Sequence, residues 1–219
     1  DTQRNSHDMP QIICAGLIAA DLVFEVPSVP VKGSKNRAAA SQMITGGGAL
    51  NAASAIASLG GEVSLAGAIG DDLFGDFLRQ KMRDRGISDR YVSVIPGVAT
   101  SRSANLITPD GDRTIINHRD AALMSGDIDL PPDFPFDAAL VDTRWPKAAL
   151  QIVQAAKRQG KPAVVDAEAP VADALAALKC ASHVVFSQQG LAHFTGEGAN
   201  ALAEAARQIG GWCAVTQGA

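Results

Sequence analysis

The alternation of short apolar runs with longer helical patterns limits the fold of this 219-residue chain more than any other feature. The runs are continuously apolar, which is typical of parallel strands covered on both faces. They predict core strands over 11–18, 63–70, 138–143, 162–167, 183–187 and 213–218. The segments between them predict helices over 49–59, 73–86, 147–160, 171–180 and 198–211. This order predicts an α/β fold, a three-layer α/β/α sandwich around a mainly parallel sheet.

Two segments, 22–45 and 99–118, break this rhythm. Apolar and polar residues alternate in them, and P-D-G-D (109–112) between the last two extended stretches is a hairpin signal. We expect these segments to form a small antiparallel β lid with one wet face. The chain is therefore predicted to be one domain over residues 1–219, from which the lid grows.

Charge and composition disfavour several classes of partner. The chain has 19 Lys and Arg against 23 Asp and Glu and no basic run, which disfavours nucleic acid or an anionic membrane. No apolar stretch approaches the roughly 18 residues of a membrane span, and the first ten residues lack the apolar core of a signal peptide. The distant cysteines Cys14, Cys180 and Cys213 are interpreted as buried thiols. We expect a cytoplasmic protein that binds a small molecule.

The stretch I-T-G-G-G-A-L-N (44–51) is the first candidate site. Glycines at a strand-to-helix junction permit positive φ and let backbone N–H groups approach a ligand. The small residues that follow would let the helix pack closely against the sheet. Tight packing alone is the alternative reason for the glycines. The stretch has neither the G-x-G-x-x-G spacing of a dinucleotide loop nor the ending of a P-loop, which disfavours a dehydrogenase.

Polar residues end several of the predicted strands. Ligands of an open parallel sheet bind at the carboxyl ends of its strands. The residues at such positions are Asp21, Asn51, Asp142, Arg144 and Asp166. A carboxylate in apolar surroundings is costly unless it is paired or binds a ligand. The group of Asp21, Asn51 and Arg144 near the glycines therefore predicts a binding site, whereas no Ser/His/Asp or Cys/His nucleophile set stands out.

The sequence from G-L-I-A-A-D (16–21) to G-D-D-L-F-G (70–75) resembles the first signature of the ribokinase, or PfkB, family of carbohydrate kinases. The resemblance continues through D-R-T-I-I-N-H-R (112–119), V-D-T-R-W (141–145), F-S-Q-Q-G-L-A-H-F-T-G (186–196) and V-T-Q-G-A (215–219). It covers nearly the whole chain in the family's order. The last three phrases are most similar to the sulfofructose kinase branch and, more distantly, to ketohexokinase.

This resemblance implies an ATP- and Mg²⁺-dependent kinase that phosphorylates a primary hydroxyl of a ketose or of an anionic, sulfofructose-like ketose. It implies sugar contacts from Asp21 and Asn51 above a pocket floor of Gly46, Gly47 and Gly48. At an anionic end of the substrate it implies Lys35, Asn117 and Arg144, and at the nucleotide it implies Ser187, Thr216 and Gly218. The residues alone leave a salt bridge to Asp142 or another core carboxylate equally open for Arg144. The resemblance also implies a homodimer formed through the lid.

Two departures from the family pattern bear on activity. Ser187 and Gly190 stand where most members have an N-x-x-E motif near the metal, although the two similar branches also lack the full motif. The catalytic Asp of the family lies in a G-A-G-D motif after the T-x-G strand. We therefore expect that Asp beyond residue 219, in a longer protein of which this chain is part. A non-catalytic sugar- or nucleotide-binding member of the same fold is the alternative.

Overall fold

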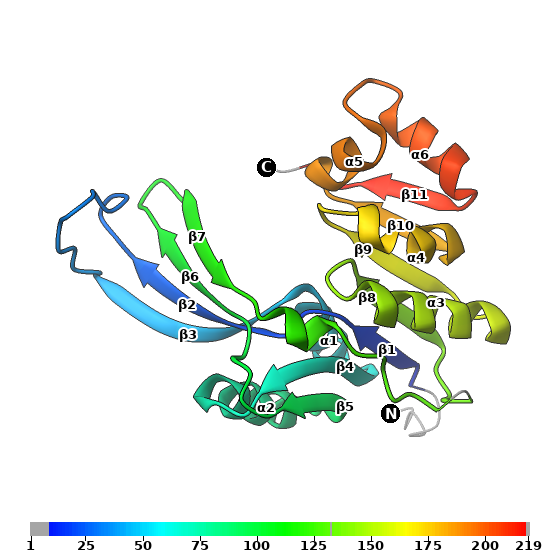
Figure 1. Cartoon of the computed structure of the whole chain (residues 1–219), viewed down its shortest axis with the longest axis horizontal. Helices are drawn as coiled ribbons and strands as arrows, with labels where there is room; N and C mark the ends of the chain where they lie inside the picture. Colours follow the sequence, from blue (N-terminus) through cyan, green and yellow to red (C-terminus); the bar gives the residue numbers. More distant parts are fainter. Residues whose placement is uncertain (1–8, 132, 218–219) are drawn as a thin grey trace, which may run out of the picture.

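The computed structural model describes residues 9–131 and 133–217. A parallel main sheet has the strand order β11-β10-β9-β8-β1-β4-β5, and a smaller sheet has the order β3-β2-β6-β7. Figure 1 shows the smaller sheet projecting away from the main sheet as an arm. This smaller sheet, β2, β3, β6 and β7, is called the lid below.

The main sheet and its helices account for most of the chain. The strands are β1 (Gln11–Ala15), β4 (Glu62–Gly70), β5 (Ser88–Ile95), β8 (Ala138–Asp142), β9 (Ala163–Ala167), β10 (His183–Phe186) and β11 (Trp212–Val215). The helices are α1 (Gly48–Ser58), α2 (Leu73–Asp84), α3 (Pro146–Gln159), α4 (Leu175–Cys180), α5 (Gln188–Thr195) and α6 (Ala201–Ile209). Short 3-10 turns cover Ala121–Met124 and Ala172–Ala174.

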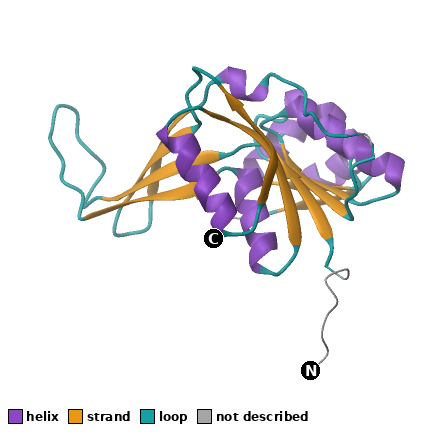
Figure 2. Ribbon diagram, turned by 90° about the horizontal axis from the view of Figure 1, so that it is seen from below, coloured by secondary structure: helices purple, strands orange, loops and turns teal. Residues whose placement is uncertain are grey.

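Different helices bury the two faces of the main sheet. On β1, Ile13 and Ala15 belong to a core with residues of α3 and α4. Cys14, which lies between them, belongs to a second core with residues of α1 and α2. Successive residues of a strand point to opposite faces, so the helices lie on both sides of the sheet (Figure 2). The predicted three-layer sandwich is confirmed.

The lid consists of β2 (Ala19–Glu25), β3 (Ala40–Gly46), β6 (Arg102–Ile107) and β7 (Arg113–His118). β2 pairs antiparallel with β3 but parallel with β6, and β6 pairs antiparallel with β7. The predicted small antiparallel lid is confirmed, with one parallel pairing, between β2 and β6, that makes its sheet mixed. After β3 the chain passes through α1, β4, α2 and β5 outside the lid. It then returns to the lid as β6, which runs in the same direction as β2.

The first apolar run, 11–18, was predicted to be one strand, but in the structure only its first five residues form a strand. β1 ends at Ala15, and the chain turns at Gly16, whose φ is 143° and where a Cβ would overlap the Asp142 carboxylate. The lid begins directly afterwards with β2 at Ala19. Asp21 consequently lies inside a lid strand rather than after a core strand.

The predictions also differ from the structure nearer the C-terminus. The predicted helix 171–180 begins as a 3-10 turn and becomes α4 only at Leu175. The last predicted strand ends early, at Val215, and residue 218 lies outside the described residues. The prediction of three buried thiols holds only for Cys14, because Cys180 and Cys213 are half-buried. No helix in the described part of the chain is long and apolar enough to cross a membrane.

Candidate functional site

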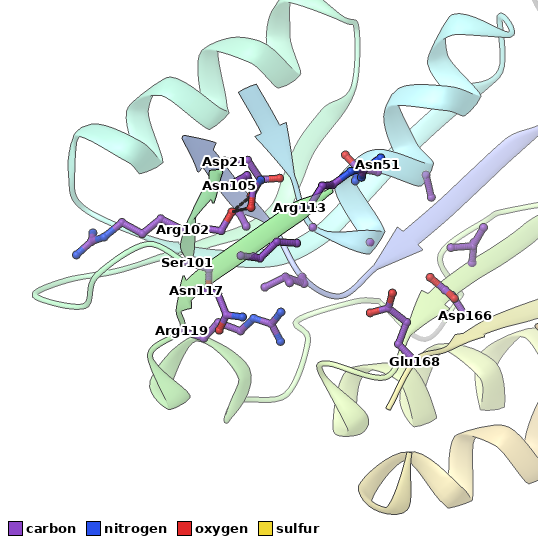
Figure 3. Close-up of a pocket in the computed structure, with 18 of the residues that line it drawn as sticks. Asp21, Asn51, Ser101, Arg102, Asn105, Arg113, Asn117, Arg119, Asp166 and Glu168 are labelled. Carbon is purple, nitrogen blue, oxygen red and sulfur yellow. Dashed lines mark hydrogen bonds between the residues drawn. The ribbon is translucent and has the colours of Figure 1, made fainter. Parts of the chain in front are cut away.

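A cavity of about 700 Å³ lies between the lid and the ends of the main-sheet strands (Figure 3). Its walls come from β2, β6 and β7 of the lid, from the first turn of α1, and from β8, β9 and β10. Asp21 and Asn51 both line it, and Gly47 and Gly48 lie beside Asn51 on the same wall. The structure thus brings the two polar side chains singled out in the sequence to one cavity.

Asp21 is held in place from within the lid. Its Oδ1 accepts a hydrogen bond of 2.6 Å from the Oγ of Ser103, which is its register partner on β6. The same hydroxyl lies 3.1 Å from Oδ1 of Asn105, and both residues line the cavity. On the neighbouring strand, a Cβ at Gly46 would overlap the Asp21 carboxylate. Gly46 does not line the cavity itself; it leaves the room that Asp21 occupies.

The next two glycines shape the start of α1. Gly47 precedes the helix with φ 90°, and a Cβ there would overlap the carbonyl of Leu17. At Gly48 a Cβ would lie 3.1 Å from Oδ2 of Asp142. Asn51 follows in the first turn, where its N–H donates to the Gly47 carbonyl at 2.9 Å. Each of the three glycines therefore makes room for a neighbouring group.

Asp142 fixes the junction between the main sheet and the lid. Its Oδ2 accepts from the Leu17 N–H at 2.8 Å, and its Oδ1 accepts from the Arg144 N–H at 2.9 Å. Burial raises the pKa of this carboxyl, and the two N–H donors oppose that rise. Asp142 does not line the cavity, and its role here is to hold the turn that leads into β2.

Two further acids, Asp166 and Glu168, line the cavity from the end of β9. Burial, with the charges of Glu168 and Asp142 adding to it, raises the pKa of Asp166 to about 6. Figure 3 shows both carboxylates on the wall opposite the lid. The cavity therefore has acidic groups on both walls, at Asp21 on the lid and at these two residues on the sheet.

Arg113 and Arg119 line the cavity from the lid side and were not singled out in the sequence. Within residues 9–131 and 133–217, neither guanidinium has a hydrogen-bond or ion-pair partner. Partial burial and, next, the nearby charge of Arg144 lower the pKa of Arg119. A third lining arginine, Arg102, forms an ion pair with Asp72 at 3.5 Å and points away from the cavity in Figure 3.

The residues implied for an anionic substrate end are not all at the cavity. Asn117 lines it, on the same lid wall as Arg119 (Figure 3). Lys35 does not, and it is exposed in the loop between β2 and β3. Arg144 is engaged elsewhere: its Nη2 contacts Oε2 of Glu168 and its Nη1 donates to the Ala169 carbonyl, both at 2.7 Å. Arg144 thus forms an ion pair, as in the structural alternative that the sequence left open, but its partner is the exposed Glu168 and not a core carboxylate.

The residues implied at the nucleotide lie in a neighbouring hollow of about 300 Å³, which Ser187 and Thr216 line together with Arg144 and Glu168. The Oγ of Ser187 caps α5 by accepting from the Gly190 N–H at 3.0 Å. Gly218 lies outside the described residues. This polar hollow at a helix N-terminus is chemically suited to phosphate oxygens.

The packing of Gly190 gives a physical reason for the missing N-x-x-E motif. A Cβ at this position would overlap the carbonyl of Ala167 at the end of β9. A glutamate here would require the start of α5 to move away from the sheet. Among the described residues, no group of three or more His, Cys, Asp or Glu side chains is placed to hold a metal ion.

Comparisons with known proteins agree with this architecture. The protein named "Probable fructokinase-3" from Arabidopsis thaliana is 33% identical over 88 residues, which are 40% of this chain and 25% of that protein. The crystal structure of a candidate ribokinase from Agrobacterium tumefaciens matches with a TM-score of 0.90 and 32% identity, over 96% of this chain and 71% of that one. Arabidopsis thaliana ribokinase complexed with ribose and ATP matches with a TM-score of 0.73 and 20% identity, over 94% and 72% of the two chains, a likeness of fold.

The match to a family profile shows to which protein family the chain belongs. Matches to the first curated relatives span less than a third of those proteins, 29% and 25% for two of them. The profile described as pfkB family carbohydrate kinase, in contrast, matches residues 9–219. With the main sheet, the projecting lid and the cavity between them, this match shows that the chain belongs to the pfkB family of carbohydrate kinases.

Proposed function

We propose that this protein is an ATP-dependent sugar kinase that phosphorylates a primary hydroxyl of a ketose or of an anionic ketose derivative. The observation that carries the proposal is that Asp21 and Asn51, from the lid and from α1, line one cavity in a chain of this family. A carboxylate accepts hydrogen bonds from hydroxyl groups, and an amide both accepts and donates them. The similarity to a protein named as a fructokinase supports a ketose as the sugar.

In this proposal the chain binds and orients the sugar and shields it from water. Asp21 accepts hydrogen bonds from substrate hydroxyls, while the hydrogen bond that Ser103 donates to Oδ1 keeps its carboxylate in place. The lid covers the sugar, which favours phosphoryl transfer to the hydroxyl over transfer to water. The general base that takes the hydroxyl proton is the Asp expected beyond residue 219. Positioning and electrostatics contribute most of the catalysis in phosphoryl transfer. Turnover would therefore need both the residues of this chain that bind the sugar and the Asp that acts as general base.

The proposed nucleotide is ATP with Mg²⁺, which would supply the phosphoryl group and offset its charge. Ser187 and Thr216, in the hollow at the start of α5, are the residues of this chain that would lie near it. The ribokinase solved with ribose and ATP has the same fold, which supports this assignment. ATP is an intracellular cosubstrate, and a cytoplasmic location is part of this proposal.

The anionic branch of the proposal rests on the guanidinium groups of the lid wall. Arg113 and Arg119 face the cavity, and Asn117 lies on the same wall. A guanidinium offers a sulfonate or phosphonate oxygen two parallel hydrogen bonds, which a neutral sugar cannot use as fully. Arg144 could join them only by leaving Glu168, and Lys35 only through a movement of its loop. We therefore rank Arg119 and Asn117 ahead of Arg144 and Lys35 for this role.

A homodimer formed through the lid is also part of the proposal. β7 is an exposed edge strand, and the Ile115 and Ile116 side chains on it are 55% and 65% exposed. Unpaired strand edges with apolar side chains favour pairing with another chain. Sedimentation of the intact protein, with and without Ile116→Lys, tests this part: a dimer that the substitution dissociates supports it, and a wild-type monomer contradicts it.

A coupled ADP-release assay on the intact protein tests the function directly. Fructose, ribose, adenosine and sulfofructose are each supplied with MgATP. We expect sugar-dependent ADP release with a ketose or its sulfonated derivative. No sugar-dependent ADP release from any of them contradicts the kinase. If calorimetry nevertheless detects sugar or nucleotide binding, the non-catalytic alternative is favoured.

A further inference from the structure

The motif G-D-D-L-F-G (70–75) identified in the sequence has no part in the cavity described above. Its second acid, Asp72, precedes α2 and caps it by accepting from the Gly75 N–H at 3.0 Å. The same carboxylate accepts from Thr100 twice, from the Oγ1 at 2.6 Å and from the backbone N–H at 3.0 Å. Asp72 therefore connects the start of α2 to a residue 28 positions later, just before the lid strand β6.

The rest of the motif is fitted to the same segment. Oδ1 of Asp71 accepts from the Gly97 N–H at 2.9 Å. The Gly70 N–H donates to Thr100 Oγ1 at 2.9 Å, and a Cβ at Gly70 would overlap the carbonyl of Val98. A Cβ at Gly75 would overlap the carbonyl of Gly70. The two glycines and two acids thus hold residues 97–100 against the core.

The segment held in this way leads directly into the cavity. Thr100 and Ser101 are buried, and Ser101 lines the cavity. Three residues after Thr100, the Ser103 hydroxyl donates to Asp21, the acid proposed to bind the sugar. A short, continuous series of contacts therefore runs from Asp72 through Thr100 to Ser103 and Asp21.

The charge of Asp72 matters for this anchor. Its carboxylate also forms the 3.5 Å ion pair with Arg102, whose guanidinium lies over the Phe74 ring at 5.1 Å from its centre. Desolvation, the largest influence, raises the pKa of Asp72, but the donors at Thr100 and Gly75 together with Arg102 outweigh it and lower that pKa. The group is thus ionised at neutral pH and can accept from several donors at once.

We propose that Asp72 is a positioning residue for the sugar site, because it fixes Thr100 and so sets where β6 places Ser103 and Asp21. The proposal rests on the proposed function, in which Asp21 binds the sugar. In this role Asp72 does more than cap a helix, because the same carboxylate accepts hydrogen bonds from the start of α2 and from the residue that precedes the lid strand β6. A substitution that keeps the cap and weakens the anchor separates these roles.

Asp72→Asn is such a substitution. Asparagine caps helices about as well as aspartate, so α2 keeps its cap. Its amide group, however, replaces one acceptor oxygen by a donor, which cannot accept from the Thr100 N–H, and the ion pair with Arg102 is lost. Asp76→Asn is the matched control, because Asp76 is an exposed acid in the first turn of the same helix.

The first measurement is sugar binding by the intact protein, with the sugar that the ADP-release assay identifies. We expect Asp72→Asn to weaken sugar affinity by about tenfold, as for loss of a hydrogen bond to a charged group, with affinity for a non-hydrolysable ATP analogue within twofold. Thr100→Val should also weaken sugar affinity, because it removes the other hydrogen bond between these two residues, the one from Thr100 Oγ1 to Asp72. The double variant, which lacks both bonds, should bind the sugar more weakly than either single variant. An unchanged sugar affinity in Asp72→Asn, or equal losses for sugar and nucleotide, overturns the proposal.

Hydrogen exchange separates a failure of this proposal from a failure of the proposed function. Without any sugar, Asp72→Asn should speed amide exchange in β6 and β7 relative to wild type and to Asp76→Asn, while exchange in α2 stays as in the control. If no sugar binds the wild-type protein, the sugar function fails, and this exchange pattern still supports the anchor. If exchange in β6 and β7 is unchanged, Asp72 does not position the lid.

Discussion

At the scale of single residues, the glycines before α1 are placed by the groups around them. Gly46 accommodates the Asp21 carboxylate and Gly47 the Leu17 carbonyl, while Gly48 lies close to Asp142. Only Gly47 has a positive φ. Tight packing, one of the two explanations open from the sequence, therefore explains all three positions. It does not compete with the proposed sugar site, because the group packed against Gly46 is the proposed sugar ligand.

Substitution of Gly46 tests this connection. In Gly46→Ala the added methyl group overlaps Asp21, so the carboxylate must leave its bond with Ser103. We expect sugar affinity to fall at least tenfold and the free energy of unfolding to fall by about 1–3 kcal/mol. Calorimetric titration and chemical denaturation measure the two effects. Gly126→Ala is the control, since a Cβ there meets nothing within 4 Å; equal binding by both variants would contradict the account.

Asp166 gives a prediction about pH. Its folded-state pKa of about 6 lies above the value of about 3.9 in an unfolded chain, so folding takes up a proton between these values. The contribution of Asp166 to stability therefore decreases as pH rises from about 4 to about 6. Asp166→Asn removes this dependence, and its melting temperature minus that of wild type should increase over that range. Thermal unfolding at a series of pH values measures the difference; a difference that stays constant with pH excludes a raised pKa.

Arg119 gives a prediction about substrate charge. Arg119→Gln removes a cavity-facing guanidinium that has no partner in the described part of the chain. We expect KM for a sulfonated ketose to rise by roughly tenfold or more, because hydrogen bonds to charged groups contribute about 1.5–3 kcal/mol, while KM for the neutral ketose changes little. Steady-state kinetics with both substrates measures this split. Arg158→Gln, on the exposed end of α3, is the control; equal changes with both substrates would point to a structural role for Arg119.

Only some of the residues that line the cavity could be predicted from the sequence. Asp21, Asn51 and Asn117 could be named because they fall within motif phrases, and all three line the cavity. Arg113 and Arg119 were missed, although Arg113, Asn117 and Arg119 are separated by even numbers of residues, which puts side chains on one face of a strand. That spacing was the available signal. The ion pair of Arg144 with Glu168 could not be foreseen, because it depends on how the ends of β8 and β9 meet.

At the scale of elements, the small side chains of α1 determine how closely the helix approaches the sheet. Ala49, Leu50 and Ala53 are its buried residues, and they pack in the core with residues of β1 and β4. Ala53→Leu should lower the free energy of unfolding by about 1–3 kcal/mol, since the added volume has no space at the sheet. Ala55→Leu, on the exposed side, should have little effect. Urea denaturation of both variants compares them; equal stabilities would show that α1 is not tightly packed.

The elements that sequence patterns predicted well are those buried on both faces. β4, β8, β9 and β10 lie within continuous apolar runs because helices or neighbouring segments cover both of their sides. β5 was not predicted, because S-D-R-Y-V-S-V-I is an edge strand with polar side chains. α5 was not predicted either, because it is a short helix whose residues had been assigned to a motif and not to a helical pattern. The parallel pairing of β2 with β6 joins segments about 80 residues apart, which no local pattern encodes.

At the scale of the whole molecule, three of the connections in the described part of the chain that join the lid to the main sheet and its helices lie at the ends of lid strands. Asp142 ties the turn before β2 to the end of β8, and Asp72 ties the start of β6 to α2. At the third, Gly46 at the end of β3 leads directly into α1. These connections surround the cavity, so the relative placement of lid and sheet fixes the distance between the groups proposed to bind the two sides of the sugar.

The most direct test of the central claim is titration of the ketose into the intact protein and into Asp21→Asn, with Asp84→Asn on the exposed surface of α2 as the control. We expect the wild-type protein and the control to bind the sugar equally. Asp21→Asn should bind it at least tenfold more weakly, because a charged acceptor in the cavity is lost. Equal sugar affinity of wild type and Asp21→Asn would contradict the claim that this cavity holds the substrate.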